Sequence, residues 1–430
     1  MKLAIIGGAG VRVPLLINGV TSRGLPIDHV ALFDIDQTRL ATIAGLARVR
    51  TPDISITVHD DLAACVTAAD FVVTSVRVGG LAARHRDERI ALEHGLVGQE
   101  TVGPGGFAMA VRTIPVLAAY ARGIARHAPS AWVINFSNPV GIVTQAMRRA
   151  ADLRIIGICD TPTELFAEIA HALAVPVHEC AFDYLGLNHL GWVREVYHRG
   201  RPLLETVWDN ATILGRIYSR PLFSPAYLAA LRLLPTEYVY YYDFPDRAIA
   251  NIRAAGRGRG AVVTELTDRL FADLNTGSTE AVRSYENYLQ QRSASYMQIE
   301  SGQAAPSPPS PWADLTGYDR IAFDVMDAIV RNSQAVIPLN VPNRGNIPEL
   351  EAADVVEVPC VVGSNGPRAL HVGGLPPQVR DLVARVKEYE RRTIEAAVVM
   401  TRDALVEALA CNPLVPSREI ARRLVTELEV

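Results

Sequence analysis

Cysteine is scarce in this chain, which has five among 430 residues: Cys65, Cys159, Cys180, Cys360 and Cys411. They are scattered, odd in number and never spaced as a Cys-x-x-Cys pair. A disulfide framework needs paired cysteines, and a structural zinc site needs closely spaced ligands. The sequence therefore argues against both, and we expect any functional cysteine to act singly.

Long hydrophobic runs and a strong net charge are also lacking. No apolar run reaches the ~18–20 residues that span a bilayer. The opening MKLAIIGGAG resembles a secretion signal for only about six residues before a glycine turn interrupts it. The net charge of −4 offers no general basic surface for nucleic acid. We therefore expect a cytoplasmic protein that binds neither membranes nor nucleic acid.

Strand and helix signals alternate regularly in the first part of the chain. Apolar, β-branched runs such as LAIIG, HVALFD, FVVTSV and LRIIGIC are separated by helical stretches, for example 38–49 and 106–127. Such runs predict parallel strands that are buried on both faces. This rhythm predicts an α/β fold, namely a Rossmann-type doubly wound parallel sheet that binds ligands at the carboxyl ends of its strands.

The alternation is lost after about residue 175. FDYLGLNHLGW is aromatic and turn-rich, VREVYHRG predicts a strand, and the Pro/Ser-rich 301–312 is typical of a surface loop or a mobile segment. Two amphipathic helices are expected at the end, from Pro377 to about Ala410 and from Ser417. Because 430 residues exceed one ordinary core, we predict an NAD-binding domain over 1–175 and an α+β domain for substrate, metal and subunit contacts over 176–430.

A glycine turn after the first strand suggests a dinucleotide. Gly7, Gly8 and Gly10 lie between a strand and a helix, although Val13 replaces the third glycine of the usual fingerprint. Asp34 ends the second strand, where a carboxylate can bind both hydroxyls of an adenosine ribose and disfavours a 2′-phosphate. The alternative is a plain tight turn with a surface acid. We expect NAD rather than NADP.

Other strand-end segments carry groups suited to phosphate and metal. RVGGLAARHRDE (77–88) holds arginines whose planar forks suit phosphate, or is simply a solvated helix start. Cys159 and His189 offer a thiolate and an imidazole that suit a divalent metal, with positions left open for substrate oxygens. No spacing rule links these two residues, so a buried structural cysteine and a hydrogen-bonded histidine are the simpler alternative.

Taken in order, these segments resemble glycoside hydrolase family 4 over nearly the whole chain. They are IIGGAG, FDID, RVGGLAARHRDE, GLVGQETVGPGGFAMAVRTIPV, NFSNP, GICDTP, GLNHLGW and YVYYY. The run GQETVGPGG and the pair CDTP/NHL are highly specific, and the layout is most similar to the 6-phospho-β-glucosidase branch. The resemblance implies a C-terminal domain of the lactate/malate dehydrogenase kind, NAD and Mn²⁺ or another divalent metal as cofactors, a phosphorylated disaccharide or glycoside as substrate, and a homodimer or homotetramer.

The resemblance assigns the reacting groups residue by residue. Cys159 and His189 match the metal ligands, and Tyr238 matches the catalytic base. Asp160, directly after the metal cysteine, is expected to protonate the leaving group. The implied route oxidises C3 of the sugar with NAD⁺, removes the proton at C2, expels the aglycone, adds water and returns the hydride. The family is an exception to the usual pair of glycosidase carboxylates.

The resemblance also assigns the substrate contacts. Asn138 matches an asparagine beside the ring hydroxyls, and Arg84 and Arg259 match arginines at the substrate phosphate. Two features depart from the pattern: the glycine turn continues with Arg12, a candidate phosphate contact, and Asp160 is similar to the 6-phospho-α-glucosidase branch. The anomeric preference therefore stays open.

Two functions of other classes compete with this interpretation. A lactate/malate-type NAD-dependent dehydrogenase shares the two-lobe plan, but it would accumulate NADH and needs no metal cysteine. A non-catalytic NAD-sensing module would bind NAD and gain nothing from a metal ion.

Overall fold

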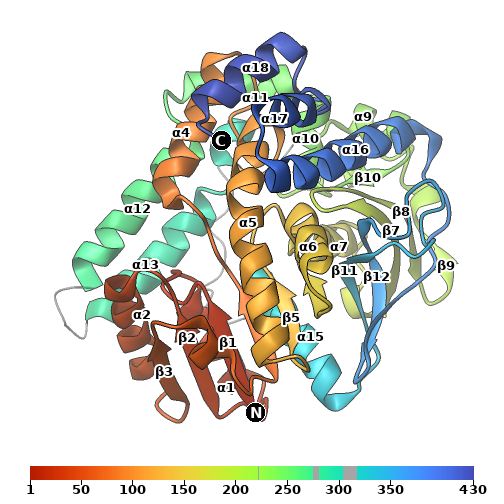
Figure 1. The fold of residues 1–430 in the computed structure, drawn as a ribbon. Coiled ribbons are helices and arrows are strands. Elements are labelled where there is room, and N and C mark those ends of the chain that lie inside the picture. Colours follow the sequence, from red (N-terminus) through yellow and green to blue (C-terminus); the bar gives the residue numbers. More distant parts are fainter. Residues whose placement is uncertain (221, 275–279, 304–316) are drawn as a thin grey trace.

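A single mixed sheet runs through the molecule with helices on both of its faces (Figure 1). The computed structural model describes residues 1–220, 222–274, 280–303 and 317–430. The Pro/Ser-rich segment expected at 301–312 therefore lies mainly outside the described residues. The strand order is β10-β8-β7-β12-β11-β6-β5-β4-β1-β2-β3, with β13 paired to β12 and β9 paired to β8.

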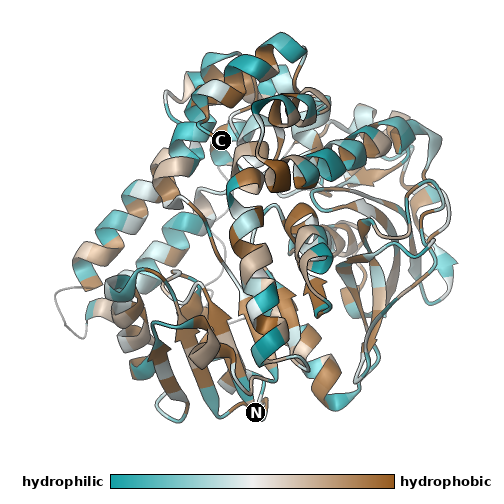
Figure 2. Cartoon of the chain, viewed as in Figure 1, coloured by the Kyte–Doolittle hydropathy of each residue, from teal (hydrophilic) through white to brown (hydrophobic). Residues whose placement is uncertain are grey.

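The N-terminal half of the sheet confirms the Rossmann-type prediction. Its six strands are parallel in the order β6-β5-β4-β1-β2-β3. The central residues of all these strands except β3 are buried because helices cover both faces, whereas in the edge strand β3 only Ile56 is buried. Figure 2 shows that the parallel strands are largely hydrophobic. The strands are β1 (Lys2–Ile6), β2 (His29–Phe33), β3 (Ser55–His59), β4 (Phe71–Thr74), β5 (Trp132–Asn135) and β6 (Arg154–Gly157).

Most helices of this half begin at a capping side chain or at a proline. Asp36 accepts a hydrogen bond from the Arg39 N–H at 3.0 Å, and Asp61 accepts one from the Ala64 N–H at 2.8 Å. The helices are α1 (Val13–Ser22), α2 (Gln37–Arg50), α3 (Leu62–Val66), α4 (Gly80–Glu93), α5 (Gly103–His127), α6 (Val140–Ala150) and α7 (Thr161–Ala172). Among the described residues only α5 has the length and hydropathy of a membrane span, and 56% of that window is buried inside the protein, as in a core helix.

The aromatic run after residue 175, which was expected to be irregular, forms a strand. β7 (Cys180–Leu187) and β8 (Leu190–His198) make an antiparallel hairpin in which Leu187 lies opposite Leu190. Asn188 and His189 are its two-residue turn, and His189 has the positive φ of 63° that such a turn requires. The predicted turn is therefore present, and it connects two strands of a hairpin.

The rest of the sheet continues directly from the parallel half. β11 (Ala335–Pro342) joins β6 through Asn340 and Gly157, and β12 (Val355–Gly363) joins β7 through Glu357 and Gly186. Short strands complete it: β9 (Arg201–Pro202), β10 (Leu234–Pro235) and β13 (Gly366–Ala369). The division near residue 175 stays a prediction, because one sheet crosses it.

Helices cover the second half, and the C-terminal prediction needs a correction. The expected helix from Pro377 to Ala410 is two helices, because Met400 has a φ of 53° and Thr401 caps the next helix. The helix expected from Ser417 is present, with Ser417 as its cap. The helices are α8 (Ala211–Leu214), α9 (Pro225–Leu231), α10 (Tyr240–Asp243), α11 (Pro245–Ala254), α12 (Arg259–Leu274), α13 (Glu280–Ala294), α14 (Gln298–Ser301), α15 (Gly317–Arg331), α16 (Pro377–Val399), α17 (Arg402–Ala410) and α18 (Arg418–Glu427), with short 3₁₀ turns at Val177–Glu179, Leu204–Thr206 and Glu237–Val239.

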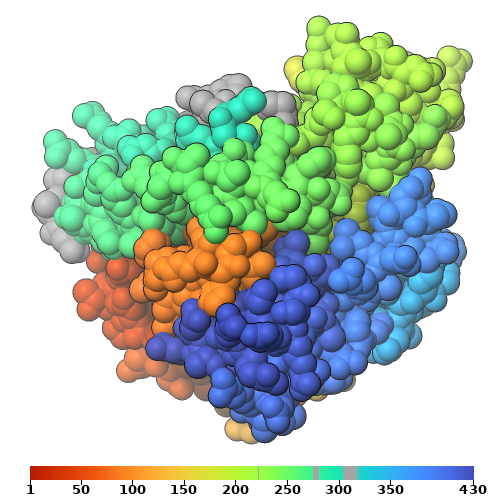
Figure 3. All heavy atoms as spheres, turned by 90° about the horizontal axis from the view of Figure 1, so that it is seen from above, coloured from red at the N-terminus to blue at the C-terminus, as the bar shows by residue number. Residues whose placement is uncertain are grey.

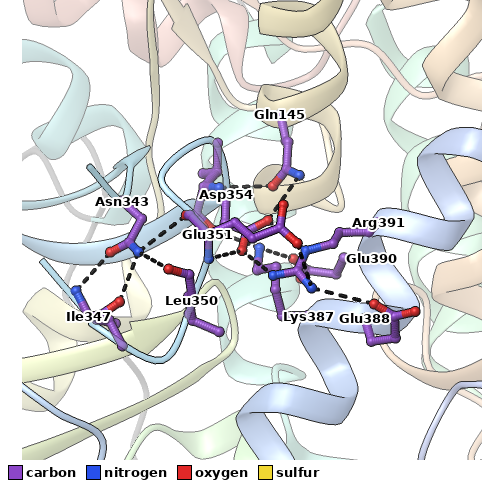
Figure 4. A network of polar contacts seen from close by, with 11 residues as sticks. Gln145, Asn343, Ile347, Leu350, Glu351, Asp354, Lys387, Glu388, Glu390 and Arg391 are labelled. Carbon is purple, nitrogen blue, oxygen red and sulfur yellow. Dashed lines mark hydrogen bonds and ion pairs between the residues drawn. The ribbon is translucent and has the colours of Figure 1, made fainter. Parts of the chain in front are cut away.

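Segments far apart in sequence meet on the outer surface and in the interior. Figure 3 shows α4 beside the C-terminal helices and the segment that contains α12, in agreement with their contacts. In Figure 4, Arg391 on α16 donates to Asp354 at 2.9 Å, and Gln145 on α6 accepts from the Val355 N–H at 2.8 Å. These hydrogen bonds therefore fix α16 and α6 against the start of β12.

Candidate functional site

The glycine turn lies where the order of the parallel strands reverses, between the ends of β1, β2 and β4. Gly7 has a φ of 94°, and a Cβ on it would lie 2.2 Å from the Ser75 carbonyl oxygen, so only glycine fits. The N–H groups of Gly7 and Gly8 both donate to the Phe33 carbonyl at 2.9 Å. The turn therefore lies close to the neighbouring strand ends.

The surroundings of this turn fit a dinucleotide. Gly10 leads into α1, which begins with no side-chain cap and directs its positive end at the crevice. Asp34 follows β2 and accepts a hydrogen bond from the Ala9 N–H at 3.0 Å, which holds the carboxylate beside the turn. A pyrophosphate at the helix terminus and a ribose at Asp34 match the arrangement that binds NAD.

One ring nitrogen of His189 has a free lone pair, which a metal ligand requires. Two backbone N–H groups, of Thr101 and Val102, donate to Gln99 Oε1, which identifies that atom as the oxygen. The Thr101 hydroxyl also donates to this oxygen at 2.9 Å, so its own oxygen accepts from His189 Nδ1 at 3.1 Å. With its proton on Nδ1, the ring keeps a free lone pair on Nε2.

The free nitrogen of His189 is an orphan in the described part of the chain. Nε2 is buried and has no hydrogen-bond partner there, and the residue is only 3% exposed. Burial lowers the pKa of the imidazole to about 4 despite the opposing charge of Glu100, so the ring is neutral at neutral pH. A buried, neutral and unpartnered imidazole nitrogen fits a divalent cation.

Cys159 follows β6 and faces the same region. Its Sγ lies 3.4 Å from Thr161 Oγ1, and the residue is 1% exposed. Burial, reinforced by Glu357 and Asp160, holds the pKa of the thiol well above its ordinary value. A bound cation would lower the pKa of this thiol, because its positive charge stabilises the thiolate. The described residues contain no group of three or more His, Cys, Asp or Glu side chains arranged for a metal.

Tyr238 packs against His189. It lies in the 3₁₀ turn after β10, where the Thr236 N–H donates to the Gly191 carbonyl at 2.9 Å and holds the segment against the hairpin. The Tyr238 ring stacks on His189, with centroids 3.8 Å apart and planes inclined by 8°. Burial raises the pKa of Tyr238 well above its usual value, and the negative charges of Glu100 and Glu237 add to this. The structure thus brings Tyr238 and His189 together and places Cys159 within electrostatic range of Tyr238.

Arginines form a second cluster around Glu100. Arg84 Nε lies 2.8 Å from Glu88, Arg84 Nη1 lies 2.9 Å from Glu100, and Arg77 Nη1 contacts the same Glu100 oxygen. Burial alone would raise the pKa of Glu100, but Arg77, Arg84 and Arg292 lower it to about 2. Several cations therefore converge on one anion in a buried space.

Arg259 belongs to the same cluster. Burial lowers its pKa, and the charges of Arg84 and Arg292 lower it further. Its guanidinium donates to Ser295 Oγ and to the Arg292 carbonyl, both at 3.1 Å. Gly260 donates its N–H to Glu88 at 2.7 Å, which ties the start of α12 to Arg84. The structure therefore brings Arg84 and Arg259 together.

Asp160 and Arg12 lie in a separate acidic environment. Burial raises the pKa of Asp160, while the Arg12 cation lowers it. Arg12 Nη1 lies 3.5 Å from Asp319, and a Cβ on Gly317 would lie 2.8 Å from Asp160 Oδ2 and 3.8 Å from Arg12 Nη1. Arg12 thus lies beside carboxylates, and the phosphate contact predicted for it stays a prediction.

Asn138 precedes α6 and has an unused acceptor. Its Oδ1 is buried without a hydrogen-bond partner among the described residues. Gly141, in the first turn of α6, packs against the hairpin turn, since a Cβ there would lie 3.4 Å from Asn188 Cβ. The Asn138 segment therefore lies beside the turn that carries His189.

Several site residues had no individual role in the sequence interpretation. Arg292 and Tyr296 meet Arg259 only through the tertiary fold, whereas Glu237 directly precedes Tyr238 in the chain. Glu100 and Thr101 lie in the glycine-rich run that attracted attention as a whole. Their pairing with Arg84 and His189 joins segments that no spacing rule connects.

Known proteins match this chain over nearly its full length. The sequence models of the family 4 glycosyl hydrolases and of the family 4 glycosyl hydrolase C-terminal domain match residues 2–175 and 184–415. A probable 6-phospho-β-glucosidase of Bacillus subtilis is 32% identical, over 100% of this chain and 95% of that protein.

Solved structures show the same fold. The 6-phospho-β-glucosidase of Thermotoga maritima, solved with NAD and glucose 6-phosphate, has a TM-score of 0.83 and 27% identity over 100% of this chain and 97% of its own. A 6-phospho-α-glucosidase from gut microorganisms, solved with NAD and Mn²⁺, has a TM-score of 0.81 and 26% identity over 99% and 97%. A malate dehydrogenase of Plasmodium falciparum, with a TM-score of 0.54 and 14% identity over 93% and 99%, is similar in fold alone. The lactate/malate dehydrogenase kind of architecture is thus confirmed.

Proposed function

The chain belongs to the family 4 glycosyl hydrolases, as its resemblance implied, and from this premise we propose that it hydrolyses 6-phosphoglycosides, in particular 6-phospho-β-glucosides. The observation that carries the proposal is the buried His189 Nε2, which has no hydrogen-bond partner among the described residues and belongs to a ring that stacks on Tyr238. A plain dehydrogenase site has no need of such a ligand. The similarity to the probable 6-phospho-β-glucosidase of B. subtilis supports the β preference.

In this proposal Cys159 and His189 bind a divalent metal, Mn²⁺ or another, and the glycine turn with Asp34 binds NAD. NAD exchanges a hydride with C3 of the sugar, and the metal polarises the C3 oxygen, which acidifies the proton on C2. The two protein ligands leave room for substrate oxygens, and the stacked rings of His189 and Tyr238 hold the base beside the metal. Because the hydride returns, NAD is regenerated in each turnover.

Tyr238 and Asp160 move protons in the proposed reaction. Tyr238 Oη takes the proton from C2, which requires a nearby cation to lower a pKa that burial raises. Asp160, whose pKa is also raised by burial, is suited to carry a proton and to pass it to the oxygen of the leaving group. Elimination through a ketone does not depend strongly on anomeric configuration, so a 6-phospho-α-glucosidase is the alternative that Asp160 supports.

The substrate contacts complete the proposal. Arg84 and Arg259 bind the 6-phosphate, with Arg77 and Arg292 adding positive charge. Asn138, with its unused Oδ1, binds a ring hydroxyl. We also propose that the enzyme acts in the cytoplasm as a homodimer or homotetramer, with separate cofactor and substrate domains meeting near residue 175.

The test is an assay with p-nitrophenyl 6-phospho-α- and β-glucosides and their unphosphorylated counterparts, with NAD⁺ and Mn²⁺ under reducing conditions. We expect release of nitrophenol from the phosphorylated β-glucoside without net NADH formation, and no activity without the metal. Preference for the α-glucoside would revise the anomeric assignment. Accumulation of NADH without hydrolysis would instead indicate a dehydrogenase and overturn the proposal.

A further inference from the structure

A pocket lies beside α7, and its volume suits a small molecule. It encloses about 400 Å³, and small-molecule pockets measure ~300–1,000 Å³. Among the described residues that line it, none is proposed to bind the metal, NAD, the ring hydroxyl or the phosphate. The pocket is therefore a separate space. Its lining includes the side chains of Glu164, Glu168, Tyr218, Arg220, Glu237 and Tyr296.

The pocket begins one helical turn beyond the proposed acid, Asp160. The Glu164 N–H donates to the Asp160 carbonyl at 3.0 Å, so the helical turn starts at Asp160. Side chains four residues apart lie on one face of a helix, which places Asp160, Glu164 and Glu168 in a row along α7. A leaving group whose oxygen meets Asp160 therefore lies at one end of this row, and the pocket continues from there.

Hydrogen bonds connect the pocket wall to the proposed reaction site. Thr161 Oγ1 donates to Glu237 Oε1 at 3.4 Å, and Cys159 Sγ lies 3.4 Å from the same Thr161 oxygen. Tyr296 donates its hydroxyl proton to Glu237 Oε1 at 2.8 Å. The guanidinium carbon of Arg259 lies 5.2 Å from the centroid of the Tyr296 ring. The pocket thus adjoins both the proposed metal ligand and a proposed phosphate arginine.

We propose that this pocket binds the leaving group of the reaction, and that the leaving group is a neutral sugar. The inference rests on the proposed hydrolysis of 6-phosphoglycosides and identifies their aglycone. The substrate is then a disaccharide with the phosphate on the sugar that is oxidised, and the second, unphosphorylated hexose occupies the pocket beside α7.

The polar groups of the pocket suit an uncharged ligand with many hydroxyl groups. The carboxyl groups of Glu164, Glu168 and Glu237 accept hydrogen bonds from hydroxyls, and the Arg220 guanidinium donates to hydroxyl oxygens. Arg220 Nε is buried and has no hydrogen-bond partner in the described part of the chain. An anionic ligand would add a negative charge where three carboxyl groups already face one guanidinium. The pocket therefore favours a neutral sugar.

The carboxylates of this region repel one another. Burial raises the pKa of Glu237 to about 7, despite the opposing hydrogen bond from Tyr296. The charges of Asp160 and Glu168 add to the increase. A hydroxyl that donates to a carboxylate stabilises its charge, whereas a further anion strengthens the repulsion. This crowding also favours a neutral sugar over a uronic acid.

The pocket is formed before a ligand enters. The Tyr218 hydroxyl donates to the Pro235 carbonyl at 2.7 Å, and the Ser219 N–H donates to Glu168 Oε1 at 2.9 Å. These hydrogen bonds fix the segment 218–219 against α7, so binding need not order it. Glu164 and Ser219 are exposed, whereas Tyr218 is only 8% exposed. The released sugar can therefore leave past the exposed residues.

The test compares two substrates of the NAD- and Mn²⁺-loaded enzyme. One is cellobiose 6′-phosphate, and the other is p-nitrophenyl 6-phospho-β-glucoside, whose nitrophenyl group has no hydroxyl to donate; the α-linked counterparts replace them if the wild type prefers that anomer. In Glu164→Gln and Glu168→Gln, kcat/KM should fall at least about tenfold more for the disaccharide than for the nitrophenyl glucoside, because hydrogen bonds to charged acceptors are lost. A glutamine at position 168 can still accept from the Ser219 N–H, so the pocket keeps its shape.

Glu205→Gln is the matched control. The Glu205 side chain is 78% exposed and pairs with Arg232 at 2.8 Å, outside the pocket. We expect this variant to hydrolyse both substrates as the wild type does. Equal losses on the two substrates in the pocket variants would overturn the aglycone assignment, while the hydrolysis itself would leave the proposed function standing. Failure of the wild type to hydrolyse either substrate would overturn the proposed function and this inference with it.

A measurement on the wild type covers the case in which a variant fails to fold. It compares kcat/KM for cellobiose 6′-phosphate with kcat/KM for the same phosphorylated disaccharide whose second sugar is glucuronic acid. We expect the anionic compound to be the poorer substrate by at least about tenfold, because its carboxylate meets those of the pocket. Equal values for the two disaccharides would overturn the inference.

Discussion

Replacement of Gly7 by alanine tests whether the glycine turn positions the cofactor. The new Cβ would lie 2.2 Å from the Ser75 carbonyl oxygen, where 3.0 Å is the practical minimum, so the turn must retreat by at least 3.0 − 2.2 = 0.8 Å. The φ of 94° adds about 1–2 kcal/mol of backbone strain. Weakening both hydrogen bonds to the Phe33 carbonyl adds about 1 kcal/mol each. The substitution should therefore cost about 3–4 kcal/mol.

Gly24→Ala is the matched control for this prediction. Gly24 also has a positive φ, 57°, but a Cβ on it would meet no atom within 4 Å, so only the backbone strain of about 1–2 kcal/mol applies. Thermal melting and NAD titration calorimetry compare the two variants. We expect Gly7→Ala to melt well below Gly24→Ala and to bind NAD at least about tenfold more weakly than wild type, or about 1.4 kcal/mol. Equal melting temperatures and equal NAD affinities would refute the reasoning.

Three further predictions concern the base, the ribose contact and the structural network. Tyr238→Phe should abolish turnover while NAD binding, measured by calorimetry, survives; retained turnover would remove Tyr238 from the role of base. Asp34→Ala should weaken NAD binding by about 1.5–3 kcal/mol and reduce discrimination against NADP, and an unchanged NAD/NADP ratio would argue against the ribose contact. Arg391→Ala breaks a pair with Asp354, whose side chain is 1% exposed, and should cost about 3 kcal/mol in urea unfolding. Arg392→Ala, which breaks a pair exposed by 47% and 43%, should cost at most about 1 kcal/mol; equal losses would contradict the burial argument.

The parallel half of the fold could be predicted from sequence because burial on both faces leaves a clear pattern. The strands β1 and β4 are continuous apolar runs, and their carboxyl ends are followed by the turn of Gly7 and by the arginine segment. The hairpin of β7 and β8 is harder to predict from the sequence. Gly186 and the Asn188-His189 turn interrupt its aromatic strands, so the segment has the sequence features of an irregular region. The break at Met400 was missed because the apolar periodicity continues across it into α17.

The site could be predicted only as separate pieces. Cys159 and His189 are predicted as a metal pair from their chemistry, and Tyr238 from the resemblance. The stacking of Tyr238 on His189 depends on the hairpin and on the pairing of β10 with β8. Tyr296 follows α13, and only the tertiary packing brings its hydroxyl to Glu237. A contact of this kind leaves no periodic or spacing signal in the chain.

The central claim is that the Cys159 thiolate and the His189 imidazole bind one metal ion beside Tyr238. Anomalous diffraction at the manganese edge, from crystals grown with MnCl₂ and NAD, tests it most directly. The account predicts one peak within about 2–2.5 Å of both Cys159 Sγ and His189 Nε2. A peak at any other place in the molecule, with these two atoms unligated, would contradict the account.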